Sequence, residues 1–135
     1  MHNSELALDY VKRAEVRLRA LDVLYDGDSW ADVVREAQEI VELALKGLLR
    51  SAGIQPPRAH DVSDILRAEH DRFPALQDPL PRLAEISRQM RRDRELAFYG
   101  AEDLTPSGFY GRPDADRARD GARHVVQVVT PIVIR

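Results

Sequence analysis

The sequence contains no cysteine among its 135 residues. Disulfide bonds, thiolate nucleophiles and cysteine-ligated metal sites are therefore excluded. The chain also lacks any apolar run near the ~20 residues that span a bilayer. Its opening residues lack the basic and apolar segments of a secretion signal, and Glu5 and Asp9 argue against an arginine-rich transit peptide. We therefore expect a protein of a reducing, cytoplasmic compartment with no membrane anchor.

Lysine is scarce, and positive charge is not in excess. Lys12 and Lys46 are the only lysines among 20 basic residues, and 23 acidic residues give a net charge of -3. This balance excludes a generic basic nucleic-acid binder, so any nucleic-acid site has to be local. Arginine favours bidentate contacts with phosphate or carboxylate, although genomic base composition is the simpler source of an arginine excess.

Apolar residues recur at steps of three and four along most of the chain, which predicts amphipathic helices. The expected helices span about 3–25, 28–53, 61–69, 81–99 and 113–130. Ser29 with Asp32 is predicted to cap the second helix, residues 100–113 to form a long loop, and Pro131 to end the last helix. We predict an all-α fold, an antiparallel up-and-down bundle of four to five helices, as one domain over residues 1–135.

The second predicted helix carries the longest apolar stripe and is expected to be the spine of the core. Its inward positions are Trp30, Val33, Val34, Ala37, Ile40, Val41, Ala44, Leu45, Leu48 and Leu49. Glu42 and Lys46 on the same helix have the favourable order for an i, i+4 ion pair and are interpreted as a surface pair.

The sequence contains few of the common motifs for metal binding, phosphate binding or nucleophilic catalysis. No two of the four histidines have the helical spacing of metal ligands, and the sequence has neither a glycine-rich phosphate loop nor a nucleophile elbow. No metal or cofactor is therefore expected. His60, which is followed by Asp61 before a short helix, is interpreted as part of a cap or turn.

Arginine is concentrated in the segment from Arg88 to Glu95. One interpretation is a solvated helix face, in which pairs with Glu95 contribute only ~0.2–0.5 kcal/mol each. The other is a phosphate-binding strip beside a tyrosine hydroxyl. The residues assigned to that strip are Arg88, Arg91, Arg92, Asp93, Arg94 and Tyr99.

Residues 37–49, then Gly53, Pro57 and His60-Asp61-Val62, resemble the central signature of HEPN domains. The later segment from Arg91 to Gly100 and a final helix rich in alanine follow in that family's order. The resemblance covers most of the chain, and it implies an antiparallel helical bundle that commonly forms a homodimer. It also implies, as a frequent partner, a minimal nucleotidyltransferase, with which such proteins form toxin-antitoxin pairs. Many members of the family are metal-independent ribonucleases.

The ribonuclease motif of the family joins an arginine to a histidine four to six residues later, often followed by a tyrosine. In this sequence the resemblance assigns Arg92 to the arginine, Asp93 to the polar position, Ala97 to the histidine and Tyr99 to the tyrosine. A second register, starting at Arg94, assigns Tyr99 to the histidine. Neither alanine nor a phenol of pKa ~10 transfers protons near neutral pH as an imidazole does. The motif is therefore degenerate, and Arg92 and Tyr99 remain as catalytic candidates.

Three hypotheses follow. The first is a HEPN protein that binds RNA or nucleotide phosphate without ribonuclease activity and acts with a nucleotidyltransferase, for which the resemblance makes Tyr99 an AMP acceptor. The second is an active ribonuclease toxin in which another group, such as Tyr99, replaces the histidine. The third is a purely structural dimerisation module. Nothing in the sequence places His60, His70 or His124 beside Arg92.

Overall fold

The computed structural model describes residues 2–99 and 105–134, without the side chains of residue 2 and of residues 92–99. Its long helices are α1 (His2–Asp26), α2 (Trp30–Ser51), α4 (Leu80–Tyr99) and α6 (Arg112–Val133). The short helices are α3 (Ser63–Ala68) and α5 (Pro106–Phe109), and two 3-10 turns, η1 (His70–Arg72) and η2 (Pro74–Leu76), precede α4. The described residues contain no strand, so the predicted all-α fold is confirmed.

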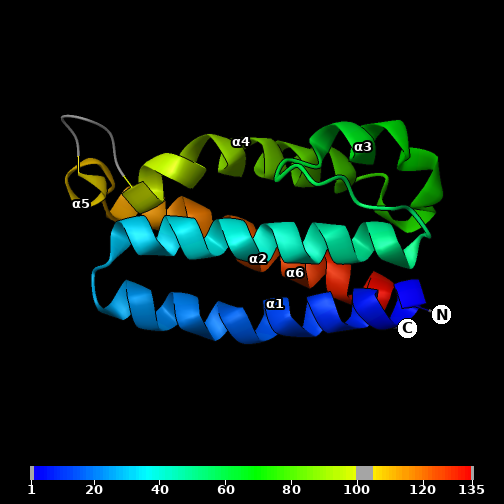
Figure 1. Ribbon diagram of the computed structural model, residues 1–135, viewed down its shortest axis with the longest axis horizontal. Helices are drawn as coiled ribbons and strands as arrows, with labels where there is room; N and C mark the ends of the chain where they lie inside the picture. The colour runs from blue at the N-terminus through cyan, green and yellow to red at the C-terminus, as the bar shows by residue number, and fades with distance from the viewer. Residues whose placement is uncertain (1, 100–104, 135) are drawn as a thin grey trace.

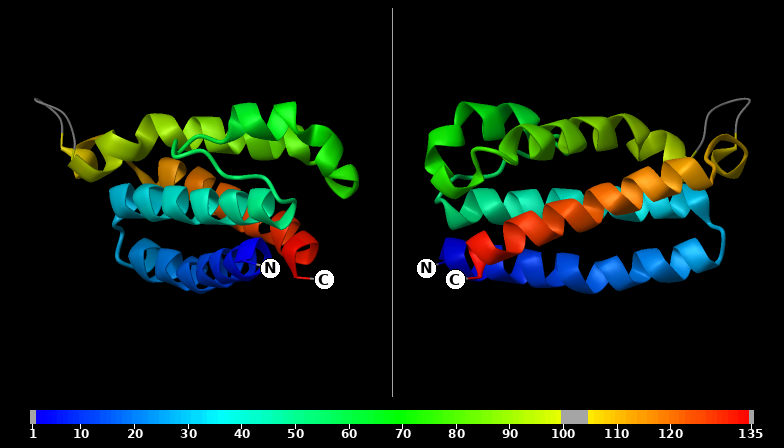
Figure 2. Two further views of the ribbon diagram at one scale, coloured as in Figure 1. Left: turned by 45° about the vertical axis from the view of Figure 1, so that its right-hand side comes forward. Right: turned by 180° about the vertical axis from the view of Figure 1, so that it is seen from behind.

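Successive long helices run in opposite directions, and the two ends of the chain lie at the same end of the bundle (Figure 1). Helix α2 lies between α1 on one side and α4 with α3 on the other. Helix α6 crosses α2 obliquely, from the end of the bundle where α5 lies to the end of α1 where the chain begins (Figure 2). The predicted antiparallel up-and-down arrangement is therefore present.

Helix α2 forms the spine of the core, as its apolar stripe predicts. Every predicted inward position of α2 after Trp30 is buried. The other helices contribute smaller apolar stripes, with Leu21 of α1, Leu83 of α4 and Val125 of α6 each fully buried. Where α1 crosses α2, Gly47 lets the two backbones approach closely, since a Cβ atom there would lie 3.2 Å from the carbonyl oxygen of Ala7.

Three local predictions need correction. Pro131 lies inside α6 rather than ending it. In the last turn proline removes one backbone donor, and the helix still closes with a bond from the Ile134 amide to the Thr130 carbonyl. The predicted loop of residues 100–113 contains α5, capped by Thr105, whose hydroxyl accepts a hydrogen bond from the Gly108 amide. Ser29 precedes α2, but its hydroxyl donates to the Asp32 carboxylate instead of capping the backbone.

None of the helices, over the residues that the structure describes, combines the length and apolarity needed to cross a membrane.

Candidate phosphate site on α4

Arg88 and Arg91 lie one helical turn apart on α4 with exposed side chains. Neither side chain makes a hydrogen bond or an ion pair in the part of the chain that the structure describes. The predicted solvated face and the predicted phosphate-binding strip both require this exposure. The other residues assigned to the strip lie outside the residues whose side chains are described: Arg92, Asp93, Arg94 and Tyr99. The same holds for Ala97.

The turn that precedes α3 is anchored on α4 at Ser87, one turn before Arg91. The Ser87 hydroxyl accepts a hydrogen bond from the Val62 amide over 3.0 Å and donates one to Asp61 Oδ1 over 3.3 Å. The same carboxylate oxygen accepts a 2.8 Å hydrogen bond from the Ser63 amide. Ser87 is buried, so these bonds hold Asp61 and Val62 against α4.

The positive charge of Arg91 affects the Asp61 carboxyl in this turn. Partial burial raises the pKa of the Asp61 carboxyl, but hydrogen bonds from Ser63 and Ser87 and the positive charge of Arg91 outweigh it. The net pKa of Asp61 therefore lies below its ordinary value. Asp61 stays ionised and keeps a negative charge near the Arg91 guanidinium.

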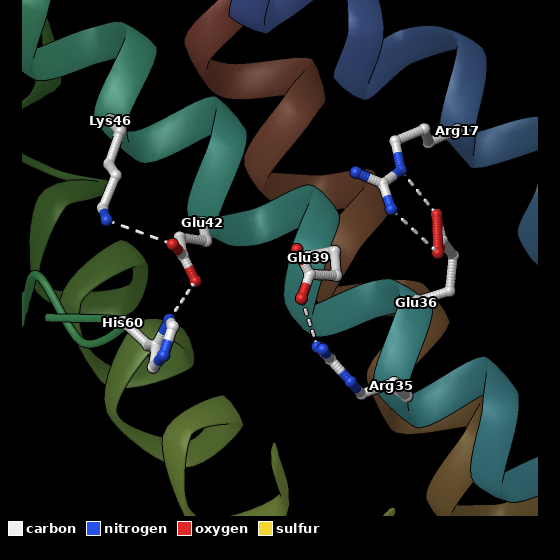
Figure 3. Close-up of polar contacts among 7 residues, drawn as sticks. All are labelled: Arg17, Arg35, Glu36, Glu39, Glu42, Lys46 and His60. Carbon is white, nitrogen blue, oxygen red and sulfur yellow. Dashed lines mark hydrogen bonds and ion pairs between the residues drawn. The ribbon is translucent and has the colours of Figure 1, made fainter. Parts of the chain in front are cut away.

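His60 and Glu42 form a contact that the sequence did not predict (Figure 3). His60 Nδ1 lies 2.7 Å from Glu42 Oε1, and Lys46 Nζ lies 3.1 Å from Glu42 Oε2. The predicted pair of Glu42 and Lys46 is therefore present, but it does not lie freely in solvent, because each side chain is less than a fifth exposed. The prediction that His60 belongs to a turn is correct but incomplete, because its ring also binds α2.

This contact belongs to a polar stripe on α2, formed by Arg35, Glu39, Glu42 and Lys46. The four positions follow one another at helical steps of four, three and four, and Arg35 pairs with Glu39 as Lys46 pairs with Glu42 (Figure 3). On a different face, Glu36 binds Arg17 of α1 through a 2.7 Å contact to Nε. The polar stripe therefore lies on a different face of α2 from the one that contacts α1.

His124 and His70 have contacts with residues other than Glu42, Lys46 and His60. His124 of α6 is half-buried, and burial together with the charge of Arg82 lowers its pKa. His70 is exposed and contacts Asp71 and Gln77. Among the described residues, no group of three or more His, Asp or Glu side chains is arranged to hold a metal ion.

Replacing Ser87 by alanine is expected to lower the free energy of unfolding by about 1–3 kcal/mol, because the Val62 amide then has no acceptor in a buried position. Urea denaturation of the variant measures this loss. Ser51→Ala is the control, since Ser51 is exposed and its hydroxyl only donates to the Leu48 carbonyl, and a change within about 0.5 kcal/mol is expected. Equal losses in the two variants would mean that the anchor at Ser87 contributes no special stability.

Comparison with known proteins identifies the type of bundle. The family model described as HEPN domain matches residues 7–132. TT1696 from Thermus thermophilus has a similar structure, with a TM-score of 0.76 and 24% identity over 93% of this chain and 96% of that chain. ST0689, an archaeal HEPN homologue, superposes with a TM-score of 0.73 and 22% identity, over 94% of this chain and 97% of that chain. No curated protein matches the chain.

Proposed function

The chain belongs to the HEPN domain family, and from this premise we propose that it binds the phosphate groups of RNA or of a nucleotide through the arginines of α4. The observation that carries the proposal is the pair of exposed guanidinium groups of Arg88 and Arg91 without protein partners among the described residues. An arginine that served only to stabilise the bundle would be expected to pair with a carboxylate, as Arg17 pairs with Glu36. The resemblance assigns the degenerate family motif to the residues that follow on the same helix, starting at Arg92 or, in the second register, at Arg94.

Guanidinium groups bind phosphate in a planar, bidentate geometry, which makes arginine the suited residue for this site. Because the molecule carries a net charge of -3, long-range attraction to RNA is weak and the affinity must come from local contacts. Arg88 and Arg91 lie on one face of α4, where residues three apart are neighbours. His60, next to the turn that Ser87 anchors, and Lys46 of α2 are further nitrogen-bearing side chains, and both contact Glu42.

We further propose, on the strength of family membership, that the protein is a cytoplasmic homodimer that acts with a minimal nucleotidyltransferase in a toxin-antitoxin pair. In that assembly Tyr99 would be the acceptor of AMP groups. The alternative of a purely structural dimerisation module requires that the arginines of α4 contribute nothing to ligand binding.

Fluorescence anisotropy with a fluorescein-labelled single-stranded RNA of twelve nucleotides tests the proposal. Arg88→Gln combined with Arg91→Gln is expected to weaken binding about tenfold or more, which corresponds to a loss of ~1.4 kcal/mol or more. The matched control is Lys12→Gln with Arg13→Gln, which removes the same charge from two exposed positions of α1. The control is expected to change the affinity less than threefold. Equal weakening of both variants, or of neither, would contradict a site on α4.

A further inference from the structure

The outer face of α1 carries a line of exposed residues at the spacing of a coiled-coil seam. Helix α1 lies at the edge of the bundle, and no other described helix lies against this face (Figure 1). Six exposed positions, here called the outer α1 stripe, follow one another at steps of three, four, three, four and three: Leu6, Asp9, Arg13, Val16, Ala20 and Val23. Residues at this spacing can interdigitate with the side chains of a second helix.

Apolar side chains of the outer α1 stripe are exposed although the core of the bundle is closed without them. Leu6 is 38% exposed, Val16 is 59% exposed and Val23 is 72% exposed. Val16, Ala20 and Val23 form a continuous apolar half of the stripe. In the other half, the two charged residues pair with each other, with Arg13 Nη1 3.7 Å from Asp9 Oδ2.

The charges beside the apolar half of the stripe are positive. Lys12 and Arg19, seven residues apart, flank Val16 on one edge, and Arg17 lies on the other edge. Arg17 is bound to Glu36 of α2. Neither Lys12 nor Arg19 makes a hydrogen bond or an ion pair with any residue that the structure describes. These two cations are therefore available to a partner.

A surface depression beside Val16 adds room for an apolar side chain. Its volume is about 270 Å³, and it is lined by Lys12, Arg13, Val16 and Arg17. The depression is open to solvent and almost entirely apolar, because the aliphatic parts of the basic side chains form its walls. An apolar side chain placed there would have positive charges around it.

We propose that the outer α1 stripe is a docking surface for an acidic amphipathic helix of a partner protein. Apolar residues of that helix pack on Val16, Ala20 and Val23 and enter the depression. Carboxylates seven residues apart along one edge of the helix pair with Lys12 and Arg19. Charge pairs that flank an apolar seam select the partner and its orientation. The stripe and α4 lie on opposite sides of α2, so this inference is independent of the phosphate site (Figure 1).

A second copy of this chain fits the stripe less well than an acidic helix does. If two copies paired antiparallel in the register that covers the whole stripe, Lys12 would face Arg19 and Glu5 would face Asp26. Parallel pairing would bring Lys12 close to Arg17. Like charges that face each other disfavour association.

A membrane surface or RNA also fits the stripe less well. Helices that lie in the membrane interface carry tryptophan, phenylalanine or leucine on the buried face, and the apolar half of the stripe has only valine and alanine. Unpaired RNA bases stack on aromatic rings, which the six residues of the stripe lack.

Fluorescence anisotropy with a labelled synthetic peptide of about eighteen residues tests the surface on the full chain. The peptide has leucine at the a and d positions of its heptads and glutamate at the e and g positions, so its own charges oppose self-association. A second peptide has lysine in place of every glutamate. The acidic peptide is expected to bind with a dissociation constant of about 1–100 μM, and the basic peptide at least about tenfold more weakly. Equal affinity for the two peptides, or no binding of the acidic one, would overturn the proposal.

Lys12→Glu combined with Arg19→Glu is expected to reverse this preference. The acidic peptide should bind the variant at least about tenfold more weakly, and the basic peptide at least about tenfold more tightly. Arg58→Glu with Arg67→Glu is the matched control, because it changes the net charge equally at two exposed positions outside α1. The control is expected to change both affinities less than about threefold. Equal effects of the two variants would mean that only overall charge matters and would refute the site.

Val16→Gln combined with Val23→Gln tests the apolar half of the stripe. Both side chains are exposed, and glutamine has a higher helix propensity than valine, so α1 is expected to stay folded by circular dichroism. The variant is expected to bind the acidic peptide at least about tenfold more weakly. An unchanged affinity would show that the peptide binds elsewhere.

Two measurements with the same valine variant distinguish the other occupants. In sedimentation equilibrium without peptide, the native chain and the variant are expected to show the same oligomeric state. A dimer that is lost in the variant would assign the stripe to a second copy and contradict the proposal. Vesicles of phosphatidylglycerol that bind the native chain but not the variant would assign it to a membrane surface, with the same consequence.

Discussion

Replacing Leu45 by alanine is expected to lower the free energy of unfolding by about 2–5 kcal/mol. Leu45 is fully buried on α2, the helix that lies between α1 and α4 and is crossed by α6. The substitution removes apolar atoms from the core and leaves a cavity, which the surrounding helices fill only in part. Urea denaturation at a fixed protein concentration measures the change.

Val23→Ala on α1 provides the comparison for Leu45→Ala. Val23 is 72% exposed, so the loss of its methyl groups is expected to change the free energy of unfolding by no more than about 0.5 kcal/mol. A loss below about 1 kcal/mol at Leu45 would show that α2 is not the spine of the core.

Replacing Gly47 by valine is expected to lower the free energy of unfolding by about 2–3 kcal/mol. A Cβ atom at this position would lie 3.1 Å from Val11 Cγ2, 3.2 Å from the carbonyl oxygen of Ala7 and 3.3 Å from Tyr10 Cβ. The oxygen belongs to the backbone of α1, so relief requires a displacement of that helix. The two methyl groups of valine increase the crowding, and equilibrium denaturation measures the cost.

Gly121→Ala is the matched control, and a change of opposite sign is expected. Its Cβ atom would lie 3.4 Å from Met90 Cε and 3.5 Å from Ile86 Cγ2, which is ordinary van der Waals contact. Alanine has a higher helix propensity than glycine, so the free energy of unfolding is expected to rise by up to about 1 kcal/mol. A loss of stability at Gly121, or none at Gly47, would contradict the packing of these helices.

Local sequence patterns were sufficient to predict the long helices and their buried faces. In α6 the apolar residues that recur at steps of mainly three and four are buried throughout: Ala115, Ala118, Ala122, Val125, Val126 and Val129. The reason is that the apolar residues that recur at helical spacing also form the face that the helix buries. This pattern involves only residues close together in the sequence. The stripe of α2 succeeded for the same reason.

Terminal and short elements were harder to predict because their energies are small. Pro131 costs one hydrogen bond in the last turn, which the packing of Ile132 and Val133 against the core offsets. Helix α5 comprises four residues and is capped by Thr105. The surrounding segment is rich in glycine and proline, which predicts a loop rather than a helix. Propensity alone does not decide such segments.

The candidate site was predicted only in part. The arginine segment is visible in the sequence because its residues are adjacent, and Arg88 and Arg91 have the expected exposure. The contact between His60 and Glu42 joins residues 18 positions apart through a loop with two prolines, so no helical spacing indicates it. The predicted pair of Glu42 and Lys46 is present, but its side chains are less than a fifth exposed, and helical spacing alone does not reveal how far other parts of the fold cover such a pair.

The salt dependence of RNA affinity tests the phosphate site on α4 most directly. Each phosphate contact to a single strand contributes about 0.7 to the slope of the logarithm of the binding constant against that of salt concentration. For the variant with Arg88→Gln and Arg91→Gln, the account predicts a slope smaller in magnitude by about 1.4 than that of the native sequence. The slope of the variant with Lys12→Gln and Arg13→Gln should stay unchanged. An unchanged slope without Arg88 and Arg91, or an equal fall in both variants, would contradict the account.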